Sequence, residues 1–193
     1  MIKRIISVMI GTTILGHGIS ILLYVNLGVD PFTSLVVGIQ YFFNTSFWLA
    51  QMGILSVFLV FVFLFNRRYL GIGTLVNTFY TGFVIDMTTP FIHKYIPQTS
   101  MNLRLIFLLV GIFLVSFGAS QVMSADLGIS TYDALAPMIE EKTGYPFKYI
   151  RITTDFLAVV IGYLLGAVVG IGTILMTLTV GPLISFFLKV FDA

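Results

Sequence analysis

The sequence contains no cysteine. Disulfides, zinc–thiolate sites, iron–sulfur clusters and cysteine nucleophiles are therefore excluded. Only two histidines are present and the acidic residues are scattered, so the sequence predicts neither a metal site nor another cofactor. Charged residues make up 9% of the chain, whereas soluble domains carry about a quarter. The net charge of +2 gives no support to nucleic-acid binding.

Hydrophobic residues dominate instead. They make up 58% of the 193 residues, and the mean hydropathy is +1.05. Such values are typical of an integral membrane protein whose surface largely contacts lipid. The first apolar run covers about 5–25 and follows Lys3 and Arg4. Because it is long for a signal-peptide core and no small-residue cleavage site follows, we expect a retained first span with a cytoplasmic N-terminus.

An internal repeat organises the chain. Residues 27–35 return as 127–135, and both stretches begin with Leu-Gly and end with Leu. Gly-Ile-Gly-Thr occurs at 71–74 and again at 170–173, where one deletion accounts for the slightly shorter offset. A repeat over most of the length indicates two copies of one structural unit.

A polar linker near residue 100 separates the two units. We predict a first membrane repeat, 1–97, and a second, 98–193, within a single integrated membrane domain. Each unit contains three long apolar stretches and one short one. The expected helices are about 5–25, 31–43, 47–65 and 73–92 in the first unit, and 105–124, 131–141, 149–165 and 172–190 in the second. The predicted fold class is an all-α polytopic membrane protein.

The two short helices decide the predicted topology. Helices over 31–43 and 131–141 are shorter than the roughly 20 residues that span a bilayer. If both enter and return, the chain has six long spans and inverted repeats; if both cross, it has eight spans and parallel repeats. In either arrangement most basic residues lie on the cytoplasmic side, so the positive-inside rule does not distinguish the two topologies. The match of Arg4 with Arg104 favours parallel repeats, whereas helix length favours six spans. We predict two repeats, each with three long spans and one short half-helix, in an inverted arrangement.

The starts of the short helices are the strongest candidates for a substrate site. Asp30 is a favoured N-cap, Pro31 suits the first helical position, and Ser130 with Asp133 resembles a capping box. Inverted-repeat transporters use such helix N-termini, with their unpaired N–H groups, to hold substrates. The predicted substrate-binding residues are Gly28, Asp30, Thr33, Ser34, Gly128, Ser130, Thr131 and Asp133. The two aspartates either face a cation or cap their own helices, and the simpler alternative makes both stretches tight turns.

Ionisable residues at membrane depth cost about 2.5–3.5 kcal/mol on insertion scales and therefore need a reason. Asp86, Asp155 and His17 are the candidates for proton or ion coupling. Each also has an alternative interpretation. For Asp86 it is a position near the aqueous end of its helix. For Asp155 it is an ion pair with Arg151 four residues earlier, and for His17 it is a hydrogen-bonded packing role.

Three glycines, Gly162, Gly166 and Gly170, are spaced four residues apart. On one helix they would form a stripe that lets another helix approach closely. We expect packing within the chain, with homodimerisation as the alternative.

A resemblance to a known family rests on these same motifs. The residues that carry it are Leu27, Gly28, Asp30, Pro31 and Phe32, then Gly71, Gly73, Thr74, Asn77, Gly82 and Asp86, and finally Gly170, Gly172, Thr173, Gly181 and Pro182. Together they resemble the YczE/YitT-like family of bacterial membrane proteins, and its YczE branch most. The resemblance implies a multi-pass protein of the bacterial cytoplasmic membrane, and it implies no particular molecular activity.

Two functions follow as hypotheses. The first is a permease or substrate-binding transport subunit for a small solute, with its site between the two short helices and its energy from an ion gradient or a partner subunit. The alternative is a membrane accessory or scaffold protein that stabilises a partner. We expect no enzyme, because no nucleophile–base arrangement is evident. Expected partners are the lipid bilayer, a small solute, and a second copy or another subunit.

Overall fold

The computed structural model describes residues 1–96 and 100–191, and these form eight α-helices without a β-strand. The helices are α1 (Ile2–Val25), α2 (Pro31–Phe43), α3 (Phe47–Phe65), α4 (Ile72–Tyr95), α5 (Met101–Ser124), α6 (Thr131–Thr143), α7 (Phe147–Leu164) and α8 (Ile171–Phe191), with a short 3-10 turn at Arg67–Tyr69. The all-α prediction is confirmed. The predicted boundary between the units, after residue 97, lies outside the described residues.

The predicted helix positions hold to within a few residues. The largest difference is at the start of α5, which we expected near 105 and which lies at Met101. A second difference concerns α4, which we expected to end near 92 with Pro90 as one of its stop signals. The helix continues past this proline to Tyr95. Within the described ranges, four helices are long and apolar enough to cross a membrane: α1, α3, α5 and α8.

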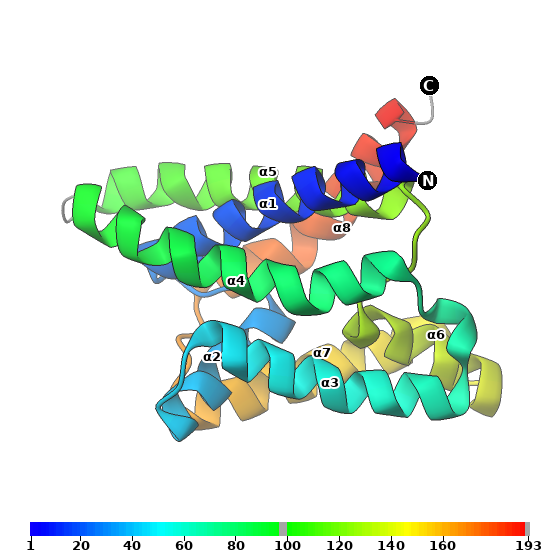
Figure 1. Ribbon diagram of the computed structural model, residues 1–193. Helices are drawn as coiled ribbons and strands as arrows, with labels where there is room; N and C mark the ends of the chain where they lie inside the picture. The colour runs from blue at the N-terminus through cyan, green and yellow to red at the C-terminus, as the bar shows by residue number, and fades with distance from the viewer. Residues whose placement is uncertain (97–99, 192–193) are drawn as a thin grey trace.

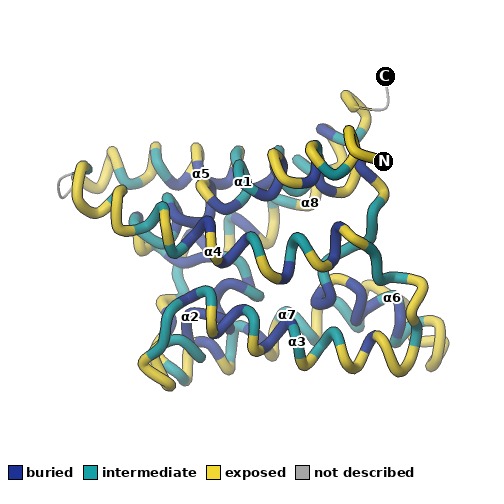
Figure 2. Tube along the Cα trace, in the orientation of Figure 1, coloured by how far each residue is buried: buried dark blue, intermediate teal, exposed yellow. Residues whose placement is uncertain are grey.

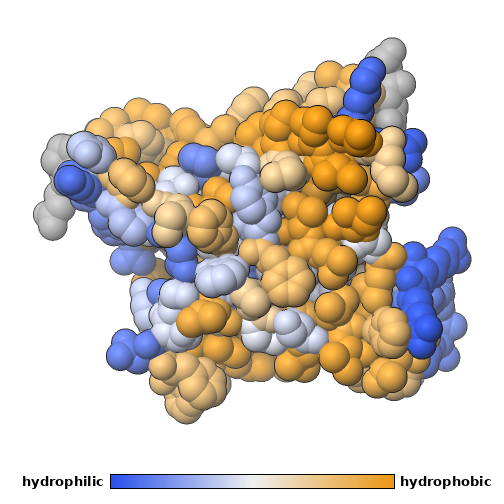
Figure 3. Space-filling model, in the orientation of Figure 1, coloured by the Kyte–Doolittle hydropathy of each residue, from blue (hydrophilic) through white to orange (hydrophobic). Residues whose placement is uncertain are grey.

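The helices form two layers. Figure 1 shows α1, α4, α5 and α8 in one layer and α2, α3, α6 and α7 in the other. Within and between the layers, α1 packs on α5 and α4, α5 on α8, α2 on α7, and α3 on α4 and α6. Buried positions lie mainly where helices face one another, and exposed positions lie outside (Figure 2). The visible outer surface is broadly hydrophobic along the helices and hydrophilic at their ends (Figure 3).

The most extensive helix–helix contact is that of α1 with α5. A Cβ at Gly11 would lie 2.9 Å from the carbonyl oxygen of Gly118, and a Cβ at Gly18 would lie 2.9 Å from the backbone of Val115. Contacts that move forward along α1 therefore move backward along α5, so the helices are antiparallel. The repeated glycines of the sequence allow this close approach.

Two turns dock on the opposite half of the chain. The carbonyl of Leu27 accepts a hydrogen bond from the N–H of Gly172 at 2.8 Å, and the carbonyl of Leu127 accepts one from Gly73 at 2.7 Å. Each Leu-Gly turn thus sits on the Gly-Ile-Gly-Thr motif of the other half. These two contacts fix where α2 and α6 begin.

Glycine is required in these turns. Gly28 has a φ of +101° and Gly128 a φ of +99°, a region that other residues rarely adopt. A Cβ at Gly28 would lie 2.5 Å from Thr173 Oγ1, and one at Gly128 would lie 2.6 Å from Thr74 Oγ1. The glycines therefore provide both the backbone conformation and the space for docking.

The predicted glycine stripe is wrong. Gly162 lies in α7 and packs against the backbone of Ser34 in α2. However, α7 ends at Leu164, so Gly166 and Gly170 belong to the connection to α8. Gly166 has a φ of +101°, and Gly170 contacts the Leu27 carbonyl. The spacing reflected a turn and a docking contact rather than one helical face.

Candidate functional site

A cavity of about 410 Å³ lies between the starts of α2 and α6. All eight α-helices contribute to its lining. Hydrophobic side chains such as Leu15, Val115 and Met176 form much of the wall, and they come from the middle turns of the long helices. The polar groups come largely from the two short helices and from α7. The cavity therefore brings both copies of the repeated motif to one place.

The start of α2 matches its prediction. The Asp30 carboxylate accepts a hydrogen bond from the N–H of Thr33 at 3.0 Å, and Pro31 occupies the first helical position. Asp30, Pro31 and Thr33 all line the cavity. The N-cap also fixes the carboxylate at the cavity wall.

The start of α6 differs from its prediction. Ser130 forms no side-chain cap, so the expected capping box with Asp133 is absent. Asp133 Oδ1 instead accepts a hydrogen bond from Arg151 Nη1 of α7 at 2.7 Å. A full ion pair satisfies the carboxylate better than a backbone N–H would. Sequence spacing within α6 gave no sign of this partner.

Arg151 organises a charged cluster between α6 and α7. Its Nε donates to Asp155 Oδ2 at 3.1 Å, which confirms the predicted ion pair four residues apart. The other Asp155 oxygen accepts from the Tyr132 hydroxyl at 2.6 Å. The guanidinium carbon lies 5.1 Å from the Tyr132 ring centroid. One cation thus holds two carboxylates and one aromatic ring in place.

The cluster contains residues that sequence reasoning missed. Tyr132 follows the predicted Thr131 directly, and its ring centroid lies 4.9 Å from that of Phe32. Phe32 and Tyr132 occupy the same position in the two copies of the motif. This recurrence of an aromatic residue is the sequence feature that could have identified them as site residues. Both line the cavity.

Three neutral polar residues complete the wall: Gln51 of α3, with Asn77 and Thr81 of α4. Gln51 is 3% exposed and Thr81 is 4% exposed. The Thr81 hydroxyl is buried without a hydrogen-bond partner among the described residues. Such groups are unusual in folded proteins. Nothing in their spacing along the sequence marked Gln51 or Thr81 as site residues.

Four of the predicted substrate-binding residues do not line this cavity. Ser34 donates to the Val29 carbonyl at 3.4 Å, and Thr131 donates to the Leu55 carbonyl at 3.2 Å. Gly28 and Gly128 form the docking turns, and Gly28 lines a second cavity instead. These residues support the starts of α2 and α6. The four that line the cavity are Asp30, Thr33, Ser130 and Asp133.

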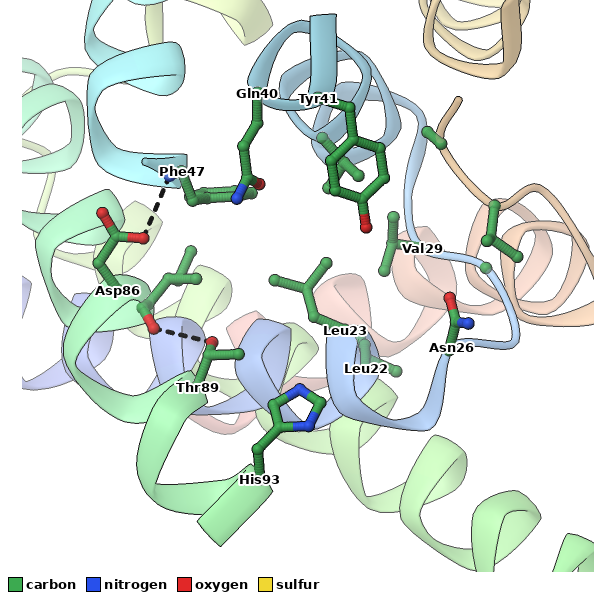
Figure 4. Close-up of a pocket in the computed structure, with 15 residues that line it drawn as sticks. Leu22, Leu23, Asn26, Val29, Gln40, Tyr41, Phe47, Asp86, Thr89 and His93 are labelled. Carbon is green, nitrogen blue, oxygen red and sulfur yellow. Dashed lines mark hydrogen bonds between the residues drawn. The ribbon is translucent and has the colours of Figure 1, made fainter. Parts of the chain in front are cut away.

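Asp86 lines a second, smaller cavity of about 160 Å³. Figure 4 shows Asp86, Thr89 and His93 of α4 on one side of it, with Gln40 and Tyr41 of α2 across the space. The Asp86 carboxylate accepts hydrogen bonds from the first N–H groups of α3, at 3.2 Å and 2.9 Å. These bonds give Asp86 a helix-capping role, and its predicted ion-coupling role stays a prediction.

His17 lies apart from both cavities. Its Nδ1 is 2.7 Å from the carbonyl oxygen of Thr13, one turn earlier in α1. Of the three ion-coupling candidates, Asp155 alone belongs to the cavity between α2 and α6.

The apolar helices and the similarity to known proteins define an integral, multi-pass membrane protein. The chain belongs to a family of unknown function, DUF6198, which matches residues 2–189. It is 31% identical to an uncharacterized protein of Haemophilus influenzae over 191 residues, covering 97% of this chain and 84% of the relative. It is 28% identical to the uncharacterized membrane protein YczE of Bacillus subtilis, covering 91% and 81%.

A third relative is the uncharacterized protein YyaS of Bacillus subtilis, at 24% identity over 95% of this chain and 91% of the relative. No solved structure matches this chain. The predicted resemblance to the YczE branch is confirmed.

Proposed function

We propose that the chain crosses the membrane six times as an inverted repeat. The spans are α1, α3, α5 and α8 together with α4 (24 residues) and α7 (18 residues), which are less apolar than those four, and the half-helices are α2 and α6. Each has 13 residues and extends about 20 Å, which is short of a hydrocarbon core of roughly 30 Å. The antiparallel contact of α1 with α5 and the reciprocal docking of the two Leu-Gly turns support this arrangement. The antiparallel contact and the reciprocal docking are what a two-fold axis in the membrane plane, relating the two repeats, would produce.

The same proposal assigns the two ends of the molecule. Asn66, after α3, donates a hydrogen bond to Glu141 near the end of α6 at 2.6 Å. These ends therefore share one side, and they carry Arg67, Arg68 and Lys142. By the positive-inside rule this side is cytoplasmic, and the N-terminus with Lys3 and Arg4 belongs to it in the bacterial cell membrane.

Within this frame we infer a permease or substrate-binding transport subunit for a small solute. One observation carries the inference: the cavity between the half-helix starts is lined by both halves of the chain and by all eight α-helices. A solute bound there would contact both halves, so motion of one half against the other would change its exposure. The volume of about 410 Å³ falls within the range of small-molecule pockets.

The accessory-protein hypothesis rested on the absence of large soluble loops or a long charged face in the sequence, combined with the glycine stripe. Because Gly166 and Gly170 lie beyond α7, no specific observation favours that alternative. A partner subunit that supplies energy remains compatible with the permease proposal.

The naturally cysteine-free chain allows a direct test of topology. Ser46→Cys lies between α2 and α3, and Asn66→Cys lies at the opposite end of α3. With re-entrant half-helices, a membrane-impermeant thiol reagent labels Ser46→Cys from outside and Asn66→Cys from inside only. The reverse pattern would make α2 a true span and would reject the inverted repeat.

A second labelling experiment tests the cavity. Asn77 lines the cavity, so Asn77→Cys would place a thiol there. Leu178 of α8 is 66% exposed on the outer surface, so Leu178→Cys serves as the lipid-facing control. A hydrophilic reagent should modify Asn77→Cys faster than Leu178→Cys in intact membranes. No labelling of Asn77→Cys from either side would contradict a solute pathway.

A further inference from the structure

The cavity between α2 and α6 contains more negative than positive side chains. Three carboxylates line it, from Asp30, Asp133 and Asp155, together with one guanidinium, from Arg151. Arg151 is engaged by Asp133 and Asp155. An anionic solute would therefore meet repulsion, despite the two helix N-termini, each of which carries about half a positive charge.

Asp30 has no cationic partner among the described residues. Its carboxylate accepts the capping bond from Thr33, and no described lysine, arginine or histidine lies within ion-pair distance. In the proposed topology Asp30 lies within the membrane, where a carboxylate requires either a proton or a counter-ion. It faces a space large enough for several non-hydrogen atoms.

Two aromatic rings line the same cavity as this carboxylate. Phe32 and Tyr132 line the cavity with their ring centroids 4.9 Å apart. The Arg151 guanidinium carbon, 5.1 Å from the Tyr132 centroid, shows that the Tyr132 ring already interacts with a cation. A carboxylate combined with aromatic faces is a recurrent arrangement for binding ammonium groups.

An unused hydrogen-bonding group points to a ligand independently of these charges. The hydroxyl of Thr81 is buried in the cavity wall without a described partner. The amide of Gln51, in a residue only 3% exposed, lines the same cavity. The Thr81 hydroxyl is available to an N–H group of a bound solute.

We propose that this cavity binds a small organic ammonium ion, with Asp30 as its counter-ion. The inference rests on the proposed function, because it names the substrate class of the same cavity. The described residues contain no group of three or more His, Asp or Glu side chains suited to a metal ion. The apolar wall and the volume suit a cation that carries carbon atoms rather than a bare proton or an inorganic ion.

The test compares two variants that each convert one aspartate to asparagine. Asp30→Asn removes the negative charge, yet asparagine is an equally good N-cap, so α2 keeps its start. Asp126→Asn makes the same change at an exposed turn residue with a φ of +50°, a conformation that asparagine tolerates. Asn26, at the equivalent position of the first unit, already has a φ of +53°.

The full chain in detergent is unfolded thermally with butylammonium or tetramethylammonium chloride, and with sodium chloride, sodium butyrate or butan-1-ol as matched probes. A ligand that binds only the folded state raises the unfolding midpoint. We expect the two ammonium salts to raise it beyond the other probes. Asp30→Asn should weaken their affinity by at least roughly tenfold, while Asp126→Asn should leave it unchanged.

Thr81→Val offers a second measurement, because valine keeps the shape and removes the hydroxyl. We expect butylammonium, which has N–H groups, to bind about two- to tenfold more weakly, and tetramethylammonium, which has none, to be unaffected. An equal loss for both ions would contradict the hydrogen bond to Thr81.

Other results would overturn the proposal. Equal effects of butan-1-ol or sodium chloride would indicate apolar or inorganic binding only, and an effect of butyrate alone would indicate an anion site. If Asp30→Asn bound the ammonium ions as tightly as the wild type, Asp30 would not be their counter-ion. The labelling of Asn77→Cys is independent of these titrations. Its success without ammonium binding would reject the substrate class and leave the permease proposal intact.

Discussion

The docking of the Leu-Gly turns should be the most sensitive point of the fold. Gly28→Ala places a methyl group 2.5 Å from Thr173 Oγ1 and 2.7 Å from the backbone nitrogen of Gly170. The first atom belongs to a side chain that can rotate, but the second belongs to the backbone and cannot. The Gly28 backbone also has a φ of +101°.

The two effects have separate magnitudes. An alanine in the left-handed region costs about 1–2 kcal/mol. Forcing an extra methyl group into a packed contact typically costs about 1–3 kcal/mol more. Gly28→Ala should therefore lower the free energy of unfolding by about 2–5 kcal/mol.

Gly144→Ala separates strain from packing. Gly144 follows α6 with a φ of +72°, but nothing lies within 4 Å of a Cβ there. This variant should show the conformational cost alone, about 1–2 kcal/mol. Gly128→Ala should resemble Gly28→Ala, because its Cβ would lie 2.6 Å from Thr74 Oγ1.

Unfolding in detergent can be followed through the fluorescence of Trp48, the single tryptophan of the chain. It lies at the start of α3 and donates its indole N–H to the Phe79 carbonyl of α4, so its environment reports on helix packing. Equal stability losses for Gly28→Ala and Gly144→Ala would refute the tight docking of the turn. The same outcome would leave the positions of α2 and α6 without their proposed support.

Three further predictions concern other contacts. Asp86→Ala removes the acceptors for two N–H groups of α3 and should cost about 1–3 kcal/mol of stability, while Asp86→Asn should cost less; unchanged stability with lost transport would instead indicate ion coupling. Hydrogen bonding to Glu141 raises the pKa of Tyr69 above its ordinary value of 10.0, so this contact should stabilise the fold below pH 10 and lose its effect as pH rises through the raised value. The stability difference between the wild type and Tyr69→Phe, measured from pH 8 to 11, should shrink accordingly. Thr81→Val should raise the free energy of unfolding by about 1 kcal/mol in the absence of solute, because it removes a buried hydroxyl without a partner; a stability loss would mean that the hydroxyl has a structural role.

Local features of the sequence determined the helices and some of their ends. The apolar runs and the turn residues located all eight helices, and the ends of α2 at Pro31 and Phe43 agree with the prediction. Asp30 could be identified as an N-cap because the capping bond to Thr33 spans only three residues. Arg151 and Asp155 could be paired for the same reason, since they lie one turn apart on α7.

Contacts between distant segments required the tertiary structure. Asp133 pairs with Arg151, eighteen positions away on another helix, rather than with the backbone next to Ser130. Asp86 caps α3 from α4, although its position suggested a free acid at membrane depth. A carboxylate accepts whichever donor the packing brings near, and the sequence does not specify which helices become neighbours.

The repeated motifs illustrate both what the sequence determines and what requires the tertiary structure. Their recurrence was visible in the sequence, because each copy keeps its Leu-Gly pair and its Gly-Ile-Gly-Thr run at nearly the same spacing. Their purpose became clear only in the fold, where the Leu27 carbonyl reaches Gly172 and the Leu127 carbonyl reaches Gly73. Glycine spacing records where the backbone must bend or come close to another segment. Which segment approaches there is decided by how the long helices pack against one another.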